Sequence, residues 1–474
     1  MLPGEAMHKR RNGIILAVAA FFVGSAAWGQ QPAGAAAQIS QSTLDDLLHR
    51  LAAAEVRIQE LEQKMGSPSA SVALVASVAP IIPPPPAPTL SAGPVMTTPA
   101  PEVTTEAIAD AQSDPHEHSM TLPGGGPTLK IRGFFDFNYG VGSIANPLVY
   151  PVADNGCGTC GNPSTPAHSG FAAGEFDLFI SSKISEHLSF VTEVVLGPDA
   201  TNTFGTDIER YQLTYKANRY FSATGGRFHT SLGYYNTAYH HGNWFSTAEG
   251  RPIMYLFEDS GGILPMHMVG ASFTGEAPHT EALGLHWVAE IGNGNQSNPA
   301  AIAVQNFNSD RNYKATNLAA FIKPQFLPGL QIGGSWYHDG LNPSQASIPL
   351  NLPEIRQNIE SAYIVYFSSN WEFMNEGVML SNHLSGTSFS FRSPMAYGQV
   401  ARKFGIYKPY FRYQYVHDSV HDPVNILSGL YYGPSVGIRV DVSDYAALKL
   451  QYNHLFQSGQ LSGNGMDAQL AFTF

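Results

Sequence analysis

Basic side chains alternate with apolar side chains in several short segments of this chain. Arg412 stands between two aromatic residues, and Arg439 stands between an isoleucine and a valine. Because neighbouring residues of a strand point to opposite faces, this spacing places each basic group on a polar face that lies opposite an apolar one. A similar pattern surrounds Arg132, Arg210 and Lys449.

Acidic side chains occur in one aromatic-rich stretch, residues 229–266. Aromatic content this high favours packing against a wall of strands, and the alternative is an external loop that packs on its neighbours. If the stretch faced the basic side chains across a narrow passage, the opposed charges would focus the electric field and sort solutes by charge and dipole. The alternative is that the basic groups pair with acids of their own strands, such as Asp136 and Asp441. The acidic residues of the stretch are Glu249, Glu258 and Asp259.

The sequence does not favour catalysis. A catalytic nucleophile needs a base within hydrogen-bond reach, but Gly-x-Ser-x-Gly does not occur and no Ser, His and Asp set stands out by its pattern. We expect no catalytic residue, and neither a cofactor nor a nucleic-acid partner.

The two cysteines of the chain, Cys157 and Cys160, lie in a glycine-rich stretch. In an oxidising compartment we expect them to form a disulfide. A metal site there would need further ligands, and only His168 lies nearby. The histidines of the 229–266 stretch, His229, His240 and His241, could bind a transition metal, but adjacent histidines lack the spacing of strong metal ligands, so no metal site is assigned.

The last residues of the chain show a strand pattern clearly. Apolar residues at every second position from Ala468 to Phe474 form one face, and Asp467, Gln469 and Thr473 lie on the other. A sheet in lipid can leave no edge unpaired, so a final strand of this kind must pair with the first strand.

Sixteen segments show such alternation, and their connections alternate between short and long. The charged fraction is only 13%, glycine and aromatic residues are plentiful, and no apolar run is long enough for a membrane-spanning helix. We expect an all-β fold, a transmembrane antiparallel up-and-down barrel of about 16 strands over residues 127–474. A soluble β-sandwich or propeller is the alternative. The expected strands are 128–141, 171–183, 188–197, 207–216, 220–228, 267–276, 282–291, 314–324, 330–338, 357–368, 371–380, 394–403, 407–416, 431–441, 447–456 and 465–474.

The segment before the barrel divides into three parts. Residues 1–29 combine a basic head, a short apolar core and small residues, which predicts a secretory signal peptide. Residues 40–65 place apolar side chains at alternating spacings of three and four from Leu44 to Met65, which predicts a coiled-coil helix. Residues 66–126 are rich in proline and alanine and cannot build a core, so we expect an extended or disordered linker.

The predicted coil carries complementary charges beside its apolar seam. In a parallel assembly, Arg50 of one chain would face Glu55 of the next, and Arg57 would face Glu62. A self-associating coil is therefore favoured over a single amphipathic helix that lies on the barrel.

The signal, coil, linker, 16-strand barrel and terminal phenylalanine together resemble trimeric porins of the Gram-negative outer membrane. Porins with a periplasmic N-terminal coiled coil have the most similar layout. The resemblance covers the whole chain but is architectural, because no short motif identifies a substrate. It implies a homotrimer in outer-membrane lipid, with the coil and linker in the periplasm and peptidoglycan as a further partner.

The same resemblance implies passive diffusion of small hydrophilic solutes or ions through a barrel that the 229–266 loop narrows. The implied pore-lining residues are Arg132, Arg210, Arg412, Arg439, Lys449, Glu249, Glu258 and Asp259. The alternatives are a structural barrel that anchors to the periplasm or to peptidoglycan through its coil, and a barrel-borne hydrolase. Neither the solute nor the sign of the ion selectivity follows from the sequence.

Overall fold

The computed structural model describes residues 118–121, 127–142, 169–198, 203–239, 243–258, 262–296, 307–309, 311–342, 353–419, 421–424, 429–458 and 462–474. All of these residues belong to one compact unit, Val95–Phe474. The predicted signal peptide and coil, most of the linker, and both cysteines lie outside the described residues.

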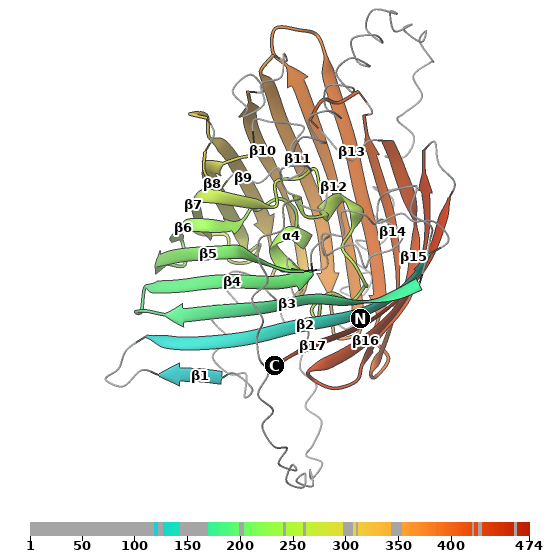
Figure 1. Cartoon of the computed structure of the whole chain (residues 1–474). Coiled ribbons are helices and arrows are strands. Elements are labelled where there is room, and N and C mark those ends of the chain that lie inside the picture. The colour runs from blue at the N-terminus through green and yellow to red at the C-terminus, as the bar shows by residue number, and fades with distance from the viewer. Residues whose placement is uncertain are drawn as a thin grey trace, which may run out of the picture. The chain divides into compact units, whose positions relative to one another are not determined.

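The described chain forms an antiparallel sheet that closes on itself (Figure 1). Each strand from β2 to β17 pairs with the next, and β17 pairs with β2, so that 16 strands complete a barrel. The predicted all-β up-and-down barrel and its strand number are therefore confirmed. The strands are β2 (Thr128–Gly142), β3 (Ser169–Lys183), β4 (Leu188–Pro198), β5 (Phe204–Asn218), β6 (Phe221–His229), β7 (His267–Glu276), β8 (Leu285–Asn293), β9 (Ala315–Ile322), β10 (Leu330–Leu341), β11 (Ile355–Phe367), β12 (Trp371–Leu384), β13 (Ser390–Arg402), β14 (Tyr407–Asp418), β15 (Gly429–Asp441), β16 (Ala446–Gln457) and β17 (Gly463–Thr473).

Residue alternation gives the barrel wall two different faces. On β16, Lys449 and Gln451 are buried on the inner face, whereas Leu448, Leu450 and Tyr452 are exposed on the outer face. The outer face of most other strands is apolar as well, which is what a bilayer requires of a barrel that crosses it, whereas β11 carries Arg356, Asn358 and Glu360 on that face. Exposed aromatic side chains lie near both ends of the strands, where membrane proteins place them at the two interfaces with water. They include Tyr215, Phe221, Trp371 and Tyr407 at one end and Tyr139, Phe171, Phe204 and Phe456 at the other.

The barrel closes where the last residue of the chain meets the first strand of the barrel. Phe474 and Gly133 exchange two backbone hydrogen bonds, each 3.0 Å long. The Phe474 ring fills the space beside Gly133, since a Cβ atom at that position would lie only 2.2 Å from the ring. The predicted pairing of the final strand with the first strand is confirmed.

A short additional strand, β1 (His118–Thr121), pairs with the first residues of β2, Thr128 to Ile131. These residues belong to the predicted linker. They join the sheet because the end of the chain pairs with β2 only from Gly133 onward, which leaves the beginning of β2 with an open edge.

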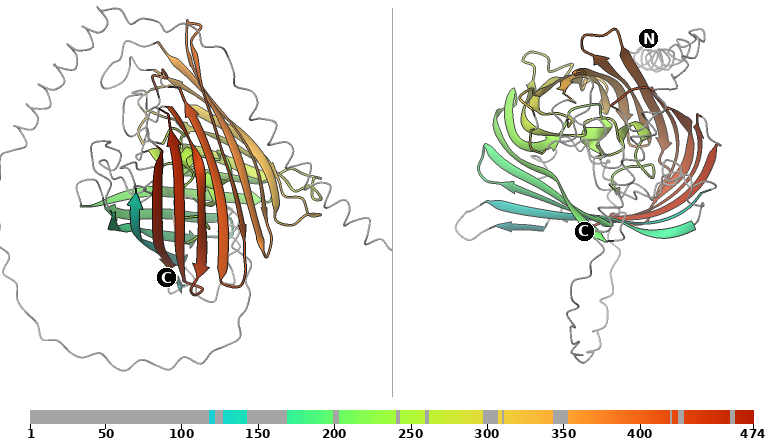
Figure 2. Two further views of the ribbon diagram at one scale, coloured as in Figure 1. Left: turned by 90° about the vertical axis from the view of Figure 1, so that its right-hand side faces the viewer. Right: turned by 45° about the horizontal axis from the view of Figure 1, so that its top comes forward.

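The connections differ between the two ends of the barrel. One end carries tight turns, such as those from β5 to β6 and from β11 to β12, and the other end carries the longest connection, residues 230–266 between β6 and β7. This connection, called the third loop below, contains α4 (Tyr235–Ala238) and the 3-10 helix η3 (Ile253–Tyr255). Figure 2 shows it within the ring of strands. Among the described residues, no helix is long and apolar enough to cross a membrane.

A β-bulge in β5 brings two consecutive charged residues to the inner face. Glu193 of β4 pairs with Arg210, but the next residue, Val194, pairs with Ile208, so Glu209 is the extra residue. Glu209 is buried, and so is most of the Arg210 side chain. A bulge of this kind re-aims a side chain that regular alternation would point outward.

Candidate functional site inside the barrel

Three of the predicted basic residues meet on the inner wall. Arg412 lies on β14, Arg439 on β15 and Lys449 on β16, and all three are buried. Arg439 and Lys449 are direct partners in the register of β15 and β16. Like charges directly opposite each other are destabilising, so this basic patch needs acceptors close by.

The third loop supplies main-chain acceptors for the two arginines. Arg412 donates a hydrogen bond of 2.9 Å to the carbonyl oxygen of Gly250. Arg439 donates to the carbonyl oxygens of Trp244 and Ser246, the second at 2.9 Å. The guanidinium group of Arg439 also lies 4.8 Å from the centre of the Trp244 ring. The loop is therefore held by its backbone as well as by one aromatic side chain.

Lys449 completes the same contact. Its ammonium group donates to the carbonyl oxygens of Asn243 and Ala248, and to the hydroxyl of Ser246 at 3.0 Å. Residues 243–250 thus place a row of oxygen atoms on the basic patch. This arrangement offsets the repulsion between the three cations and fixes the loop to β14, β15 and β16.

The three acidic residues predicted to face the basic patch, Glu249, Glu258 and Asp259, do not lie together there. The Glu249 carboxylate lies beside the basic patch, 3.4 Å from the Gln451 amide nitrogen of β16. Glu258 is not brought to the patch, because its carboxylate accepts a hydrogen bond of 2.9 Å from the backbone N–H of His267 at the start of β7. Asp259 lies outside the described residues.

The strand register separates Arg132 from the basic patch. Lys449 pairs with Gln469 of β17, and Gln469 pairs with Asn138 of β2. Arg132 lies six residues before Asn138 in the same strand, which is a distance of about 20 Å at roughly 3.3 Å per residue. Because β2 neighbours the last strands in a closed barrel, the sequence predicts that Arg132 joins Arg412, Arg439 and Lys449 in one patch. The prediction is wrong for Arg132, which lies at a different position along its strand.

Arg132 belongs to a different row of the inner wall. Arg132 pairs with Phe179, Phe179 pairs with Glu193, and Glu193 pairs with Arg210. Arg210 forms an ion pair of 2.5 Å with Glu193 and lies 5.3 Å from the centre of the Phe179 ring. The two predicted arginines of β2 and β5 therefore share one row, with a carboxylate between them.

Glu376 anchors the first part of the third loop, and the sequence analysis did not single it out. It is buried on the inner face of β12 and accepts hydrogen bonds from the backbone N–H groups of Tyr234 and Tyr235, at 2.6 and 2.9 Å. The hydroxyls of Tyr255 and Tyr397 donate to the same carboxylate, at 2.8 and 2.6 Å. Burial, followed by the charge of Glu376, raises the pKa of the Tyr255 hydroxyl well above its usual range, so this hydroxyl stays protonated and donates.

Glu290 of β8 is a second anchor that the sequence analysis missed. Its carboxylate accepts from the backbone N–H of Ser231 at 3.0 Å, from the Ser231 hydroxyl at 2.8 Å and from the Asn317 amide at 2.8 Å. The only feature of the sequence that could have identified Glu376 and Glu290 is the alternation of polar and apolar residues. Alternation predicts that a side chain points inward, but it does not show which loop atoms the side chain contacts.

Apolar packing supports these polar anchors. The rings of Tyr235 and Tyr255 stack with their centres 5.6 Å apart. Both belong to a buried cluster that joins the loop to the inner wall and includes Leu232, Met254 and Leu264. The high aromatic content of the loop is thus accounted for by its contacts with the strands.

The described part of the chain contains no group of three or more His, Cys, Asp and Glu side chains placed to hold a metal ion. His240 and His241 lie outside the described residues, as do Cys157 and Cys160. The predicted disulfide therefore stays a prediction.

The protein resembles known proteins in structure but not in sequence. No family model matches the chain, and no curated protein sequence matches it. The anion-selective porin of Comamonas acidovorans is 9% identical and has a TM-score of 0.50, over 73% of this chain and 100% of the porin. OmpF of Salmonella typhi, in a complex with daunomycin, is 8% identical and has a TM-score of 0.50, over 75% of this chain and 100% of that protein. At these identities the likeness establishes the architecture alone: the chain has the fold of Gram-negative outer-membrane porins.

Proposed function

We propose that this protein is an outer-membrane porin through which small hydrophilic solutes or ions diffuse passively. A barrel of 16 strands is wide enough to leave an aqueous channel, unlike one of eight strands. The apolar outer face and the exposed aromatic residues at both strand ends support a position across a membrane. In this proposal the protein is a channel and not an enzyme.

The third loop narrows the channel. The observation that carries this proposal is the contact between residues 243–250 and the cations Arg412, Arg439 and Lys449. The loop leaves the wall at β6 and returns at β7, whereas these cations lie on β14 to β16, several strands away in both directions around the barrel. A connection that binds both regions crosses the interior, and the space left for a solute is reduced accordingly.

The pore-lining residues then act in two ways. Arg412, Arg439 and Lys449 hold the loop and contribute positive charge beside Glu249. Asp441 partly offsets the charge of Arg439 through an ion pair of 2.7 Å, as the alternative from the sequence predicted. Arg132 and Arg210 line the wall of β2 and β5, where Glu193 partly offsets their charge. Because little water separates such groups, their charges influence a passing ion more strongly than exposed surface charges do. Asp259 remains a candidate for the same passage.

The barrel has an even number of strands, so its two ends emerge on one side of the membrane. We propose that this side, with its tight turns, is the periplasm, and that the long loops face outward. The signal peptide, coil and linker then fit an exported chain whose coil supports a homotrimer in the periplasm and approaches peptidoglycan. Native mass measurement tests the assembly: Leu51→Asp with Ile58→Asp should weaken the trimer, and a wild-type monomer would contradict it.

Conductance across a planar lipid bilayer tests the function itself. Purified protein should insert and produce discrete, ohmic current steps in simple salt solutions, and liposomes that contain it should swell in small sugars. A folded, inserted protein that never conducts would contradict the porin proposal.

A further inference from the structure

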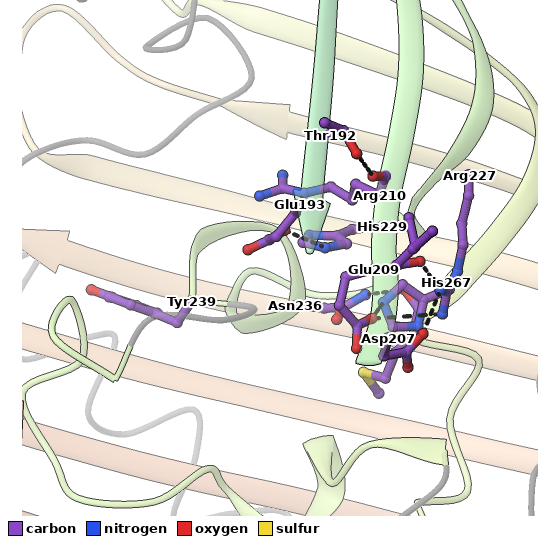
Figure 3. Close-up of polar contacts among 12 residues, drawn as sticks. Thr192, Glu193, Asp207, Glu209, Arg210, Arg227, His229, Asn236, Tyr239 and His267 are labelled. Atoms are coloured by element: carbon purple, nitrogen blue, oxygen red, sulfur yellow. Dashed lines mark hydrogen bonds and ion pairs between the residues drawn. The ribbon is translucent and has the colours of Figure 1, made fainter. Parts of the chain in front are cut away.

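A second charged cluster lies at the other end of the third loop, on the inner face of β4 to β7 (Figure 3). It contains carboxylates, arginines and two histidines on neighbouring strands, and the third loop adds one more carboxylate where it rejoins the wall at β7. The cluster residues are Glu193, Asp207, Glu209, Arg210, Arg227, His229, His267 and the loop residue Glu258.

His267 lies between two carboxylates of this cluster. Its Nε2 atom is 2.6 Å from a carboxylate oxygen of Glu209, and its Nδ1 atom is 3.2 Å from a carboxylate oxygen of Glu258. The side chains of His267, Glu209 and Glu258 are only 4%, 6% and 2% exposed. The imidazole ring therefore connects the bulge residue of β5 to Glu258, which lies just after η3 in the third loop.

A charged ring fits this geometry best, because both nitrogens lie within ion-pair distance of a carboxylate. A neutral imidazole has one N–H donor and one nitrogen lone pair, so it can satisfy one carboxylate but must present a lone pair to the other. An imidazolium has a donor on each nitrogen and a positive charge between two negative ones. In a buried site, replacement of such a cation by a neutral ring leaves two carboxylates with reduced compensation.

The charged groups around the ring come from every strand packed against it. On β6, His229 lies edge-on with its ring centre 5.5 Å from that of His267, and its Nε2 atom is 3.8 Å from Glu193 of β4. Arg227 of β6 lies 3.6 Å from Glu209. Arg210 is paired with Glu193.

The other contacts of each carboxylate decide whether its attachment depends on the charge of His267. Arg227 also lies 3.5 Å from Asp207 of β5, so a permanent cation stays beside the β5 carboxylates whatever the charge of the ring. Among the described residues, the Glu258 carboxylate is contacted by the backbone and the ring of His267. Glu258 is therefore the carboxylate whose attachment depends most on the proton of His267.

We propose that protonated His267 is a latch that ties the C-terminal end of the third loop, through Glu258, to Glu209 of the barrel wall, and that loss of the proton releases this end. Only the effect of the latch on conduction rests on the proposed function. The attachment itself is a property of the folded barrel, and it can be measured in a protein that does not conduct.

The rest of the loop has attachments that contain no imidazole. Its first part is held by Glu290 and Glu376, and its middle part by the basic patch. Release should therefore be local, and should affect the segment after η3 that carries Glu258. Residues 231–239 should stay in place, and so should Ile263, Leu264 and Met266, which pack in the buried cluster.

Hydrogen–deuterium exchange of the intact barrel at a series of pH values tests the latch. Exchange is corrected for the intrinsic pH dependence of amide exchange and compared from about pH 5 to about pH 9, the range around histidine titration. In the wild type, peptides that cover residues 256–262 should exchange at least about tenfold faster once the ring is neutral, since a hydrogen bond to a charged group stabilises the closed state by at least that factor. Peptides that cover residues 231–239 should show no such step.

Three variants sharpen the result. His267→Gln, which keeps a donor but no charge, should exchange rapidly in residues 256–262 at every pH and show no step. His338→Gln is the matched control, because His338 lies on the outer face of β10 and bonds to Asn358, and it should keep the wild-type step. Glu258→Gln provides a second test from the other side of the contact if His267→Gln does not fold, and it should also abolish the step.

Conduction provides an independent readout. If the proposed function holds, single-channel current fluctuations should increase with pH in the wild type and be independent of pH in His267→Gln. A wild-type exchange profile without a step, or a step that survives in both His267→Gln and Glu258→Gln, would overturn the latch. A normal exchange step in a barrel that never conducts would overturn the channel and leave the latch in place.

Discussion

Arg412 of β14 donates a 2.9 Å hydrogen bond to the carbonyl oxygen of Gly250, which lies 162 residues earlier in the chain. The acceptor belongs to the backbone, so no side-chain substitution at position 250 removes it. The path of the third loop therefore depends on the wall residues that bind it. Variants of the wall are accordingly the sharper test of what the loop does.

Removing the two arginines that bind the loop should change both the size and the charge of the passage. In Arg412→Ala with Arg439→Ala, the loop loses donors to residues 244–250 and the interior loses two positive charges. We expect a larger single-channel conductance and a shift of the reversal potential toward cation preference. Arg402→Ala is the control, because Arg402 lies over Trp371 and Phe404 at the tight-turn end. Identical conductance and ion preference in the double variant and the wild type would contradict this role.

Loss of the Glu376 carboxylate should destabilise the barrel interior. Glu376→Ala leaves the backbone N–H groups of Tyr234 and Tyr235 and two tyrosine hydroxyls without their acceptor. Each buried donor left unpaired costs about 1–3 kcal/mol, so the free energy of unfolding should fall by at least about 3 kcal/mol. Urea unfolding in micelles, followed by tryptophan fluorescence, measures this change. Glu281→Ala, in the exposed connection between β7 and β8, should reduce the free energy of unfolding far less than Glu376→Ala, and equal losses in both variants would refute the anchor.

Barrel closure should depend on the absence of a side chain at position 133. In Gly133→Val, the new side chain would occupy the space of the Phe474 ring, so the last strand should pair less well with β2. We expect a lower folded fraction in refolding experiments, scored by the gel shift between unheated and heated samples. Gly197→Val is the matched control, since no heavy atom lies within 4 Å of a Cβ atom there. Equal folded fractions would show that the ring can move aside at little cost.

The barrel was predictable because the alternation of polar and apolar residues that indicates a strand can be seen within each short segment. In β16 and β17, residues two apart share a face, and the identity of Leu450 or Gln469 reveals which face is apolar and which is polar. Turn positions then follow from where the alternation breaks. β1 was not predictable in this way, because it pairs with the part of β2 that β17 leaves free. The length of that part depends on the register between β17 and β2, which alternation does not show.

The candidate site was predictable only in part. Arg412, Arg439 and Lys449 were placed on one wall because they lie on consecutive strands. The loop atoms that these residues bind were not predictable, since every residue has a main-chain carbonyl and the sequence does not show which one accepts the hydrogen bond. Glu258 was grouped with Glu249 by charge, yet Glu249 lies at the middle attachment of the loop and Glu258 bonds to the backbone N–H of His267 at the start of β7.

The orientation of the barrel can be tested by labelling intact cells. Single cysteines are introduced in a variant that lacks Cys157 and Cys160, at Ser388 between β12 and β13 and at Asp444 between β15 and β16. Both positions are exposed and lie at opposite ends of the barrel. A membrane-impermeant maleimide should label position 388 in intact cells and position 444 only after the outer membrane is opened. The reverse pattern would invert the proposed topology.

Single-channel conductance of the wild type and of a variant that lacks residues 234–246 tests the central claim most directly. The deletion removes α4 and the residues that bind Arg439 and Lys449, so the interior should open. We predict that both proteins conduct and that the variant has the larger unit conductance in the same salt. A variant that folds and inserts but conducts like the wild type would show that the third loop does not limit the passage, and a wild type that never conducts would contradict the channel itself.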